Sequence, residues 1–459
     1  MGVRIRATSA PHRSTYAYII ERLANSSMEK YLGDSTFLVK RRNRALILEI
    51  ILKRGPISRV QISDITHLSR AAVSTLTAEL IECGLIHEVP QVASEERRGA
   101  GRIPTMLDIR QGLGGVIAID IARDRVAGAF INLKGGIDEE IVHEVQDPRE
   151  LPQVADLVRQ LIATLRTNAS ERGKLPLGIG VSLPGIIHRE TGILEYSSTL
   201  GWENVNLMNI FAKDSDIPVM IDRNARAMVL AEHTFGAGQG FSNLALIYVG
   251  TGIGCGLMLN GEIFAGSTSR AGELGHTHVV DGGRRCFCGG SGCLETVASG
   301  RAIAELAIEE IEKGNKSLIG NLAGGDLSNI TAETVAKAAN EGDRLALEIF
   351  ENAGTHLGNA IANLMGIIDT RLIILAGGVM NAGDLLLKPI RNIITARTLR
   401  GGEPPEIRVS AFGDKIGVIG AGALALKELV YSPKLILPGD IDLEAAQIKS
   451  AFISYNRNF

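Results

Sequence analysis

Between residues 43 and 87, apolar positions recur at the spacing of one helix face in three short segments. The first segment ends at a Gly-Pro pair, which stops a helix. The second begins after Ser58, which forms a capping-box pattern with Gln61 three residues later. The third follows Ser69, a favourable N-cap residue, and stops at a glycine. The pattern predicts three helices joined by tight turns.

Two short apolar runs, residues 85–90 and 103–109, flank a polar, basic stretch and predict a two-stranded wing. Segment 40–102 carries eleven basic and seven acidic residues in a protein of net charge −3. Three helices and a wing are typical of a winged helix-turn-helix, whose last helix enters the major groove of DNA. A helical protein-interaction or dimerisation module of the same layout is the alternative. The expected DNA contacts are Ser69, Arg70, Ala71, Ala72, Ser74, Thr75, Arg97, Arg98 and Arg102.

From residue 114 onward, short β-rich runs alternate with helical stretches, which predicts an α/β body. The same order of hairpin-like runs and helices occurs twice, so two similar lobes are expected. The expected strands are 115–122, 126–133, 177–185, 218–222, 244–259, 372–379 and 406–412, and the expected helices 153–168, 222–235, 295–312, 332–364 and 415–430. The predicted domains are an N-terminal extension (1–35), the winged helix-turn-helix (36–110), the body (111–431, with lobes of about 111–240 plus 410–431 and 241–409) and a C-terminal extension (432–459).

The remaining composition narrows the class of protein. No apolar run approaches the length of a membrane span, and the first twenty residues lack the apolar core of a secretory signal. A cytoplasmic protein without a membrane partner is therefore expected. Three of the five cysteines lie within eight residues. In a long intracellular chain, such a cluster indicates a metal site before it indicates disulfides.

The clustered cysteines, Cys286, Cys288 and Cys293, lie in a glycine-rich loop that His276 precedes. Three thiolates and one imidazole are the ligand set of a closed, structural zinc site. His278 competes with His276 for the fourth position. Three reduced, metal-free cysteines in a turn are the alternative interpretation.

This loop resembles the zinc motif of the ROK family (repressor, open reading frame, kinase), in which Glu-x-Gly-His precedes Cys-x-Cys-Gly-x-x-Gly-Cys-x-Glu. Residues 273–276 and 286–295 match it position by position, and the resemblance extends over residues 37–430. It implies an actin-like, sugar-kinase-like (ribonuclease H-like) body of two lobes. It also implies that Glu273, His276 and Glu295 hold sugar hydroxyls. For Glu295, a charge that stabilises a helix N-terminus is the alternative.

The same resemblance implies that the phosphate side of the site has degenerated. Kinases of the family wrap phosphates with an Asp-x-Gly-x-Thr turn, but here Asp120 is followed by Ala122 and Asp124 at the glycine and threonine positions. Their Glu-Asn-Asp-Ala-Asn string aligns with residues 222–226, and Asn224 replaces the catalytic aspartate. An amide is not a general base at neutral pH. We therefore expect no enzyme activity; an active ATP-dependent sugar kinase with an accessory DNA-binding domain is the alternative.

Asn224 and Arg223 are expected to face the ligand, and an arginine is unusual at that position. It either pairs with an anionic substituent of the sugar or, as we favour, forms a salt bridge with a nearby carboxylate such as Asp222 or Glu232. The expected function is a transcription regulator, most simply a repressor of carbohydrate genes, that binds a double-stranded operator as a homodimer or homotetramer and responds to a sugar. A protein-regulated switch without a small ligand is a third hypothesis.

Overall fold

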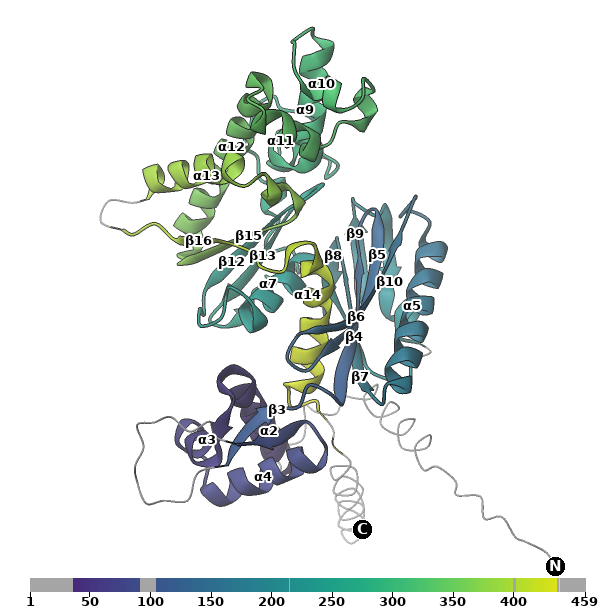
Figure 1. The fold of residues 1–459 in the computed structure, drawn as a ribbon, viewed down its shortest axis with the longest axis vertical. Helices are drawn as coiled ribbons and strands as arrows, with labels where there is room; N and C mark the ends of the chain where they lie inside the picture. The colour runs from purple at the N-terminus through teal and green to yellow at the C-terminus, as the bar shows by residue number, and fades with distance from the viewer. Residues whose placement is uncertain (1–35, 91–104, 214, 399–401, 436, 438–459) are drawn as a thin grey trace, which may run out of the picture.

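The computed structural model describes residues 36–90, 105–213, 215–398, 402–435 and 437. A small N-terminal domain lies at one end of a larger body with two lobes (Figure 1). The predicted extensions, apart from 432–435 and 437, and the basic wing tip at 91–104 lie outside the described residues. Among the helices of the described part, none is long and apolar enough to cross a bilayer.

The N-terminal domain has the predicted winged helix-turn-helix layout. Ser58 caps the second helix in a reciprocal capping box with Gln61, and the Ser69 side chain accepts a hydrogen bond from Ala72 N at the start of the third. Its three strands form a sheet in the order β1-β3-β2. The elements are α2 (Thr36–Arg54), β1 (Ile57–Ser58), α3 (Arg59–Thr66), α4 (Arg70–Glu82), β2 (Ile86–Val89) and β3 (Met106–Ile109).

Each lobe of the body is built on a five-stranded sheet, in the order β11-β7-β4-β5-β6 in the first lobe and β14-β13-β12-β15-β16 in the second. In both sheets, a central strand pairs antiparallel with the next strand of its hairpin and parallel with a strand from later in the chain. The predicted α/β fold is confirmed. The strands are β4 (Gly114–Ile121), β5 (Arg125–Asn132), β6 (Ile137–Glu144), β7 (Leu175–Leu183), β11 (Val219–Arg223), β12 (Leu244–Val249), β13 (Ile253–Leu259), β14 (Glu262–Ile263), β15 (Leu372–Ala376) and β16 (Glu406–Val409).

Helices cover both sheets, and two of them pack together at the centre of the body. Helix α7 (Asn224–Phe235) packs on α14 (Ile416–Ala425), which continues as a π-helical turn, Leu426–Val430, and also contacts β4 and β7. The other helices are α5 (Leu151–Glu171), α6 (Leu207–Phe211), α8 (Glu295–Ala298), α9 (Gly300–Glu312), α10 (Ile319–Leu322), α11 (Ala332–Asn340), α12 (Arg344–Ile368) and α13 (Asp384–Arg397), with 3₁₀ turns at Leu274–His276, Leu327–Asn329, Gly378–Ala382 and Gly413–Lys415.

Several details differ from the sequence prediction. The helix expected at 295–312 is two helices, because Ser299 is extended and caps the second, and strand β6 was not predicted. The single helix expected at 332–364 is two helices. Gly342 has a φ of +86° in the turn that follows the first helix, and Asp343 caps the second. A three-stranded sheet that was not predicted, β10-β9-β8, projects from the first lobe. Its strands are β8 (Ile186–His188), β9 (Ile193–Ser197) and β10 (Trp202–Asn206).

The N-terminal domain and the body share one apolar core. Ile47 of α2 and Leu435, which follows the π-helical turn, belong to the same cluster of buried side chains. Arg44 is only 1% exposed, and its Nη2 donates a 2.7 Å hydrogen bond to the Leu435 carbonyl. Lys427 of the π-helical turn forms an ion pair of 3.3 Å with Glu49 of α2. The DNA-binding domain is therefore docked on the end of the body rather than linked by a free tether.

Candidate functional site

The cysteine-rich loop brings four ligand groups together. The ligand atoms of His276, Cys286, Cys288 and Cys293 all lie within 4.8 Å of one another. His276 Nδ1 is 3.5 Å from Cys286 Sγ, and Cys288 Sγ is 3.6 Å from Cys293 Sγ. Zinc bonds of roughly 2.0–2.3 Å in a tetrahedron place ligand atoms about 3.3–3.8 Å apart. The four groups therefore fit a zinc ion without a change of fold.

His278, the competing fourth ligand, lies outside this cluster. One of its ring nitrogens is 3.0 Å from the Ser291 carbonyl, and the other is 2.9 Å from Asp281 Oδ1. Antiparallel contacts between segments 277–280 and 292–294 direct the two histidines to different places, since Val279 N donates to Gly292 O and Leu294 N donates to Thr277 O. Among the described residues, His276 is the histidine that belongs to the metal cluster.

The three residues that the resemblance assigns to sugar hydroxyls lie beside the metal cluster. Glu273 Oε2 is 3.8 Å from His276 Nε2, so this imidazole presents one nitrogen to the cysteines and the other to the carboxylate. Glu295, the first residue of α8, accepts a 2.9 Å hydrogen bond from Ile253 N and lies 3.5 Å from Arg301. Glu295 therefore lies at the N-terminus of α8 and also next to the glycine-rich turn before β13.

Arg223 makes a salt bridge, as the favoured interpretation expected, but with a carboxylate that was not among the named examples. Its Nη1 is 2.6 Å from Glu273 Oε1, and neither Asp222 nor Glu232 receives its side chain. Instead, Glu232 Oε2 accepts a hydrogen bond from Ala237 N. The named partners of the favoured interpretation are therefore wrong, although a salt bridge is present. No local pattern in the sequence indicates Glu273 as the partner of Arg223, because the two residues are 50 positions apart.

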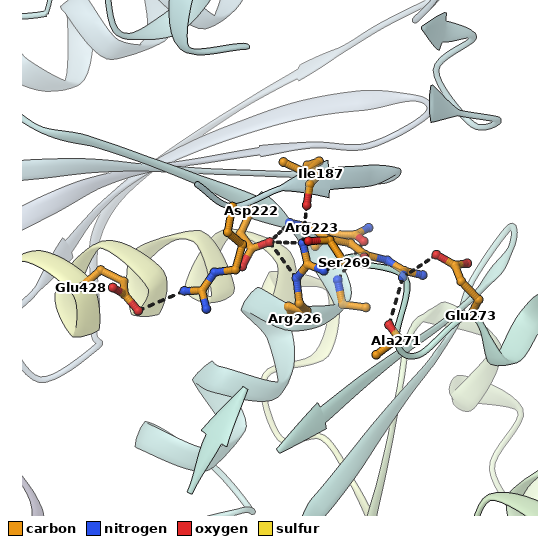
Figure 2. A network of polar contacts seen from close by, with 11 residues as sticks. Ile187, Asp222, Arg223, Arg226, Ser269, Ala271, Glu273 and Glu428 are labelled. Atoms are coloured by element: carbon orange, nitrogen blue, oxygen red, sulfur yellow. Dashed lines mark hydrogen bonds and ion pairs between the residues drawn. The ribbon is translucent and has the colours of Figure 1, made fainter. Parts of the chain in front are cut away.

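Asp222 is the centre of a buried polar network (Figure 2). Its Oδ1 accepts hydrogen bonds from Arg223 N and Arg226 Nε, each at 2.7 Å, and the Arg226 Nη2 contacts the same oxygen. The Arg226 guanidinium also donates at 3.0 Å to the carbonyls of Ile187, in β8, and Ser269, in the loop after β14. Arg226 therefore joins the two lobes beside the candidate ligand site.

A second arginine extends this network toward the DNA-binding domain. Arg189 Nε is 3.1 Å from Asp222 Oδ2, and its Nη2 donates at 3.0 Å to Glu428 in the π-helical turn. Figure 2 follows the contacts from Glu273 at one end to Glu428 at the other. The preceding residue, Lys427, contacts α2 through its ion pair with Glu49. Polar contacts thus run from the candidate ligand site to α2, a helix of the DNA-binding domain.

The turn at residues 120–124 and Asn224, which the resemblance aligns with the phosphate turn and the base of a kinase, make internal contacts. Asp120 is buried and accepts a 2.7 Å hydrogen bond from Ser182; burial raises the pKa of Asp120, and this hydrogen bond partly opposes the rise. Ala122 N is bonded to the Arg125 carbonyl at 2.8 Å, which closes the turn. Asn224 begins α7, and its Oδ1 accepts from Ala225 N at 2.8 Å. Burial also raises the pKa of the nearby Cys255 thiol to about 12.

The predicted DNA-contacting residues of α4 lie on its open face. Ser69, Arg70, Ala71, Ser74 and Thr75 are exposed and Ala72 is half-buried, whereas Val73, Leu76 and Leu80 are buried in the core. Thr75 Oγ1 donates to the Ala71 carbonyl at 3.1 Å. The wing arginines Arg97, Arg98 and Arg102 lie outside the described residues. Arg59, on α3, pairs with Glu88 of the wing strand at 2.9 Å.

Comparison with known proteins divides the chain at the same place. The pattern of the ROK family matches residues 116–428, and a winged helix-turn-helix DNA-binding pattern matches residues 41–87. The chain is 30% identical to the xylose repressor of Caldicellulosiruptor bescii over 404 residues, which covers 88% of this chain and all of that protein. It is 35% identical to a glucokinase of Halalkalibacterium halodurans over 318 residues, or 68% of this chain and 95% of the kinase.

The solved structures agree with these relatives. The crystal structure of a ROK family transcriptional regulator, described as a homologue of the E. coli MLC protein, superimposes with a TM-score of 0.74 at 28% identity. The match covers 86% of this chain and 98% of that regulator, a larger share of this chain than the 68% that the glucokinase match covers. The two-lobed body, the His and Cys cluster and the family match lead to one conclusion: this chain belongs to the ROK family and carries an N-terminal winged helix-turn-helix.

Proposed function

We propose that this protein is a DNA-binding transcriptional repressor that responds to a sugar and does not phosphorylate it. The observation that carries the proposal is the docking of a winged helix-turn-helix, with an open recognition face on α4, directly onto a body of the ROK family. The similarity to a xylose repressor over 88% of the chain supports the same assignment. A sugar effector and a double-stranded operator follow as its two ligands.

Zinc is proposed as a structural ion in this protein. His276 Nδ1 and the three thiolates would hold it, and four protein ligands leave no open position for chemistry. His276 would keep its Nε2 for the side of Glu273 and a sugar hydroxyl. The ion supplies a fixed position for the imidazole, and the ring of Glu273, His276 and Glu295 orients the ligand.

The proposal that no phosphoryl transfer occurs rests on two positions. A kinase of this kind needs a base on the sugar hydroxyl and a turn that wraps phosphates. At the first position, the Asn224 side chain accepts a hydrogen bond from the N–H of Ala225 at the start of α7, and an amide does not accept a proton near neutral pH. At the second, Ala122 has a Cβ where the family has glycine, and Asp124 repels a polyphosphate. Release of ADP from ATP, measured with glucose, xylose and N-acetylglucosamine, is expected to stay at background, and sugar-dependent turnover would contradict this part of the proposal.

The route from sugar to DNA is proposed to pass through Arg189. A ligand that bonds to Glu273 adds a partner to the carboxylate that pairs with Arg223, and the backbone N–H of Arg223 is bonded to Asp222. Asp222 holds Arg189, which holds Glu428 beside the ion pair between Lys427 and Glu49. For a sugar to change DNA binding, it must favour one arrangement of this network over the other. Through these contacts, sugar binding would change the position of α2 relative to the body.

The test of the proposed function is selection of binding sites from a random library of duplex DNA with the full-length protein. We expect a two-fold symmetric site, since winged helices of a homodimer read paired half-sites, and light scattering should show a dimer or tetramer. Arg70→Ala, in the first turn of α4, should weaken binding by about tenfold or more, because a base contact contributes roughly 1–3 kcal/mol.

Arg172→Ala is the matched control for this test, because it removes the same charge from an exposed site in the first lobe. Equal losses in the two variants would mean that DNA binding is a general charge effect. Failure to enrich any sequence would contradict the repressor assignment itself.

A further inference from the structure

The turn between β11 and α7 has an unusual charge for a sugar site. The family motif Glu-Asn-Asp-Ala-Asn has two carboxylates and no cation, whereas Asp222-Arg223-Asn224-Ala225-Arg226 has one carboxylate and two guanidinium groups. An excess of negative charge thus becomes an excess of positive charge at the edge of the proposed effector site. The N-terminal end of α7, which follows directly, adds to the same sign of potential.

The two arginines of this turn have different surroundings. Arg226 is 1% exposed, and its three guanidinium nitrogens are all bonded to protein oxygens of Asp222, Ile187 and Ser269. The Arg226 guanidinium group therefore holds the two lobes together. The Arg223 guanidinium has described hydrogen bonds only through Nη1, to Glu273 Oε1 and, at 3.5 Å, to the Ala271 carbonyl. Among the described residues, its Nε and Nη2 donate no hydrogen bond, so this edge keeps two unused donors.

Glu273 fixes the direction of that free edge. The ion pair of 2.6 Å holds Arg223 beside the carboxylate that lies 3.8 Å from His276 Nε2, so the guanidinium belongs to the same ring of groups as the proposed sugar ligands. Cys255 of β13 lies close enough that the charges of both Arg223 and Glu273 act on its thiol. The side chain of Arg223 is 7% exposed, so it is held among these groups and does not extend into solvent.

Hydrogen-bond chemistry then limits what the ligand can present to Arg223. The asparagine of the family motif both donates and accepts, so it can satisfy a sugar hydroxyl in either direction. An arginine only donates, so it cannot accept the proton of a hydroxyl placed against it. A hydroxyl placed there would accept from Arg223 but would need another acceptor for its own proton. A carboxylate or phosphate has no proton to place and matches the Nε and Nη2 edge in bidentate fashion.

We propose that Arg223 is a specificity-determining residue that makes this protein respond to an anionic sugar, one that carries a carboxylate or a phosphate. The inference rests on the proposed function, because it places the ligand in the ring of Glu273, His276 and Glu295. In the complex, Arg223 Nη1 stays on Glu273 while Nε and Nη2 bind the two oxygens of the anion. Arg226 keeps its internal bonds and does not contact the ligand.

The test is calorimetric titration of the full-length, zinc-loaded protein with matched sugars. The probes are glucose, glucuronate, gluconate and glucose 6-phosphate, and xylose with xylonate. The inference predicts that at least one acid or phosphate binds about tenfold or more tightly than its neutral parent, and the separate arms show whether the anion is a carboxylate or a phosphate. Arg223→Asn should remove that preference, and Arg223→Lys should keep only part of it, because lysine has the charge without the fork.

Arg270→Asn is the matched control, since this exposed arginine, in the loop after β14, pairs with Glu195 and has no contact with Glu273. It should leave the preference unchanged. Circular dichroism and zinc content establish that each variant is folded. Neutral sugars that bind as well as the anions, or an Arg223→Asn variant that keeps the preference, would overturn the inference. If wild type binds neutral sugars alone and Glu273→Gln abolishes that binding, the proposed function stands and only the inference falls; if no sugar binds to any folded variant, both fall.

Discussion

Substitution of Gly292 by alanine is a direct test of how the backbone shapes the metal loop. Gly292 has a φ of +67°, and a Cβ at this position would overlap the Val280 carbonyl oxygen and lie 2.9 Å from His278 Cε1. Gly282, in the same loop, has a φ of +66° but no atom within 4 Å of such a Cβ. The two substitutions therefore share the left-handed backbone conformation and differ only in the overlap.

The expected magnitudes follow from that difference. An L side chain in the left-handed region costs about 1–2 kcal/mol, which applies to both variants. The overlap at Gly292 must be relieved by a shift of backbone, which typically costs a further ~1–3 kcal/mol. The shift reaches the metal cluster, because Gly292 N donates at 2.9 Å to the Arg284 carbonyl and the next residue is Cys293.

Two measurements on purified protein check this reasoning: zinc per chain after dialysis, by mass spectrometry, and the thermal unfolding midpoint. Gly292→Ala should bind less zinc and unfold at a lower temperature than Gly282→Ala, which should keep its zinc and lose only part of its stability. If the two variants have equal zinc content and equal midpoints, the described loop does not position the cluster, and the reasoning is refuted.

Three further predictions concern the rest of the molecule. Burial raises the pKa of Asp120 in the folded state. Keeping Asp120 protonated therefore contributes to folding stability in full below the ordinary pKa of an aspartate, and this contribution is lost as the pH rises through the raised pKa. Asp120→Asn should therefore raise the unfolding midpoint at pH 8 but not near pH 3, and equal shifts at both would contradict the burial effect. Arg44→Met removes the hydrogen bond to the Leu435 carbonyl and should weaken domain docking by about 1.5–3 kcal/mol, seen as faster proteolysis between the domains; an unchanged rate would mean that this contact does not hold them. Asn224→Asp restores a carboxylate at the base position but leaves the phosphate turn altered, so ADP release with glucose should remain at background, and turnover would show that the turn is competent.

Local features of this fold could be predicted from the sequence because their causes are local. The starts of α3 and α4 follow from Ser58, Gln61 and Ser69, whose side chains bond to backbone groups three residues away. The break between α11 and α12 had the same kind of signal, an aspartate cap after Gly342, but the apolar periodicity continued across it. The strands of the β8–β10 sheet are three to five residues long, too short for a clear alternation.

The candidate site was predictable only as far as its residues are close in sequence. The cysteine spacing indicated a metal cluster, but the choice between His276 and His278 depends on strand-like pairing with residues 292–294 that no local pattern shows. The ion pairs of Arg223 with Glu273 and of Arg189 with Glu428 join residues 50 and 239 positions apart. Single charges in turns carry no signal of such partners, so these contacts required the folded chain.

The most direct test of the account is the affinity of the full-length, zinc-loaded protein for its selected operator, measured by fluorescence anisotropy with and without the sugar that binds in calorimetry. The account predicts that saturating sugar weakens operator binding about fivefold or more, the lower range of allosteric coupling, and that Glu273→Gln abolishes this response to sugar. Sugar that binds at the Glu273 site and leaves operator affinity unchanged would contradict the account.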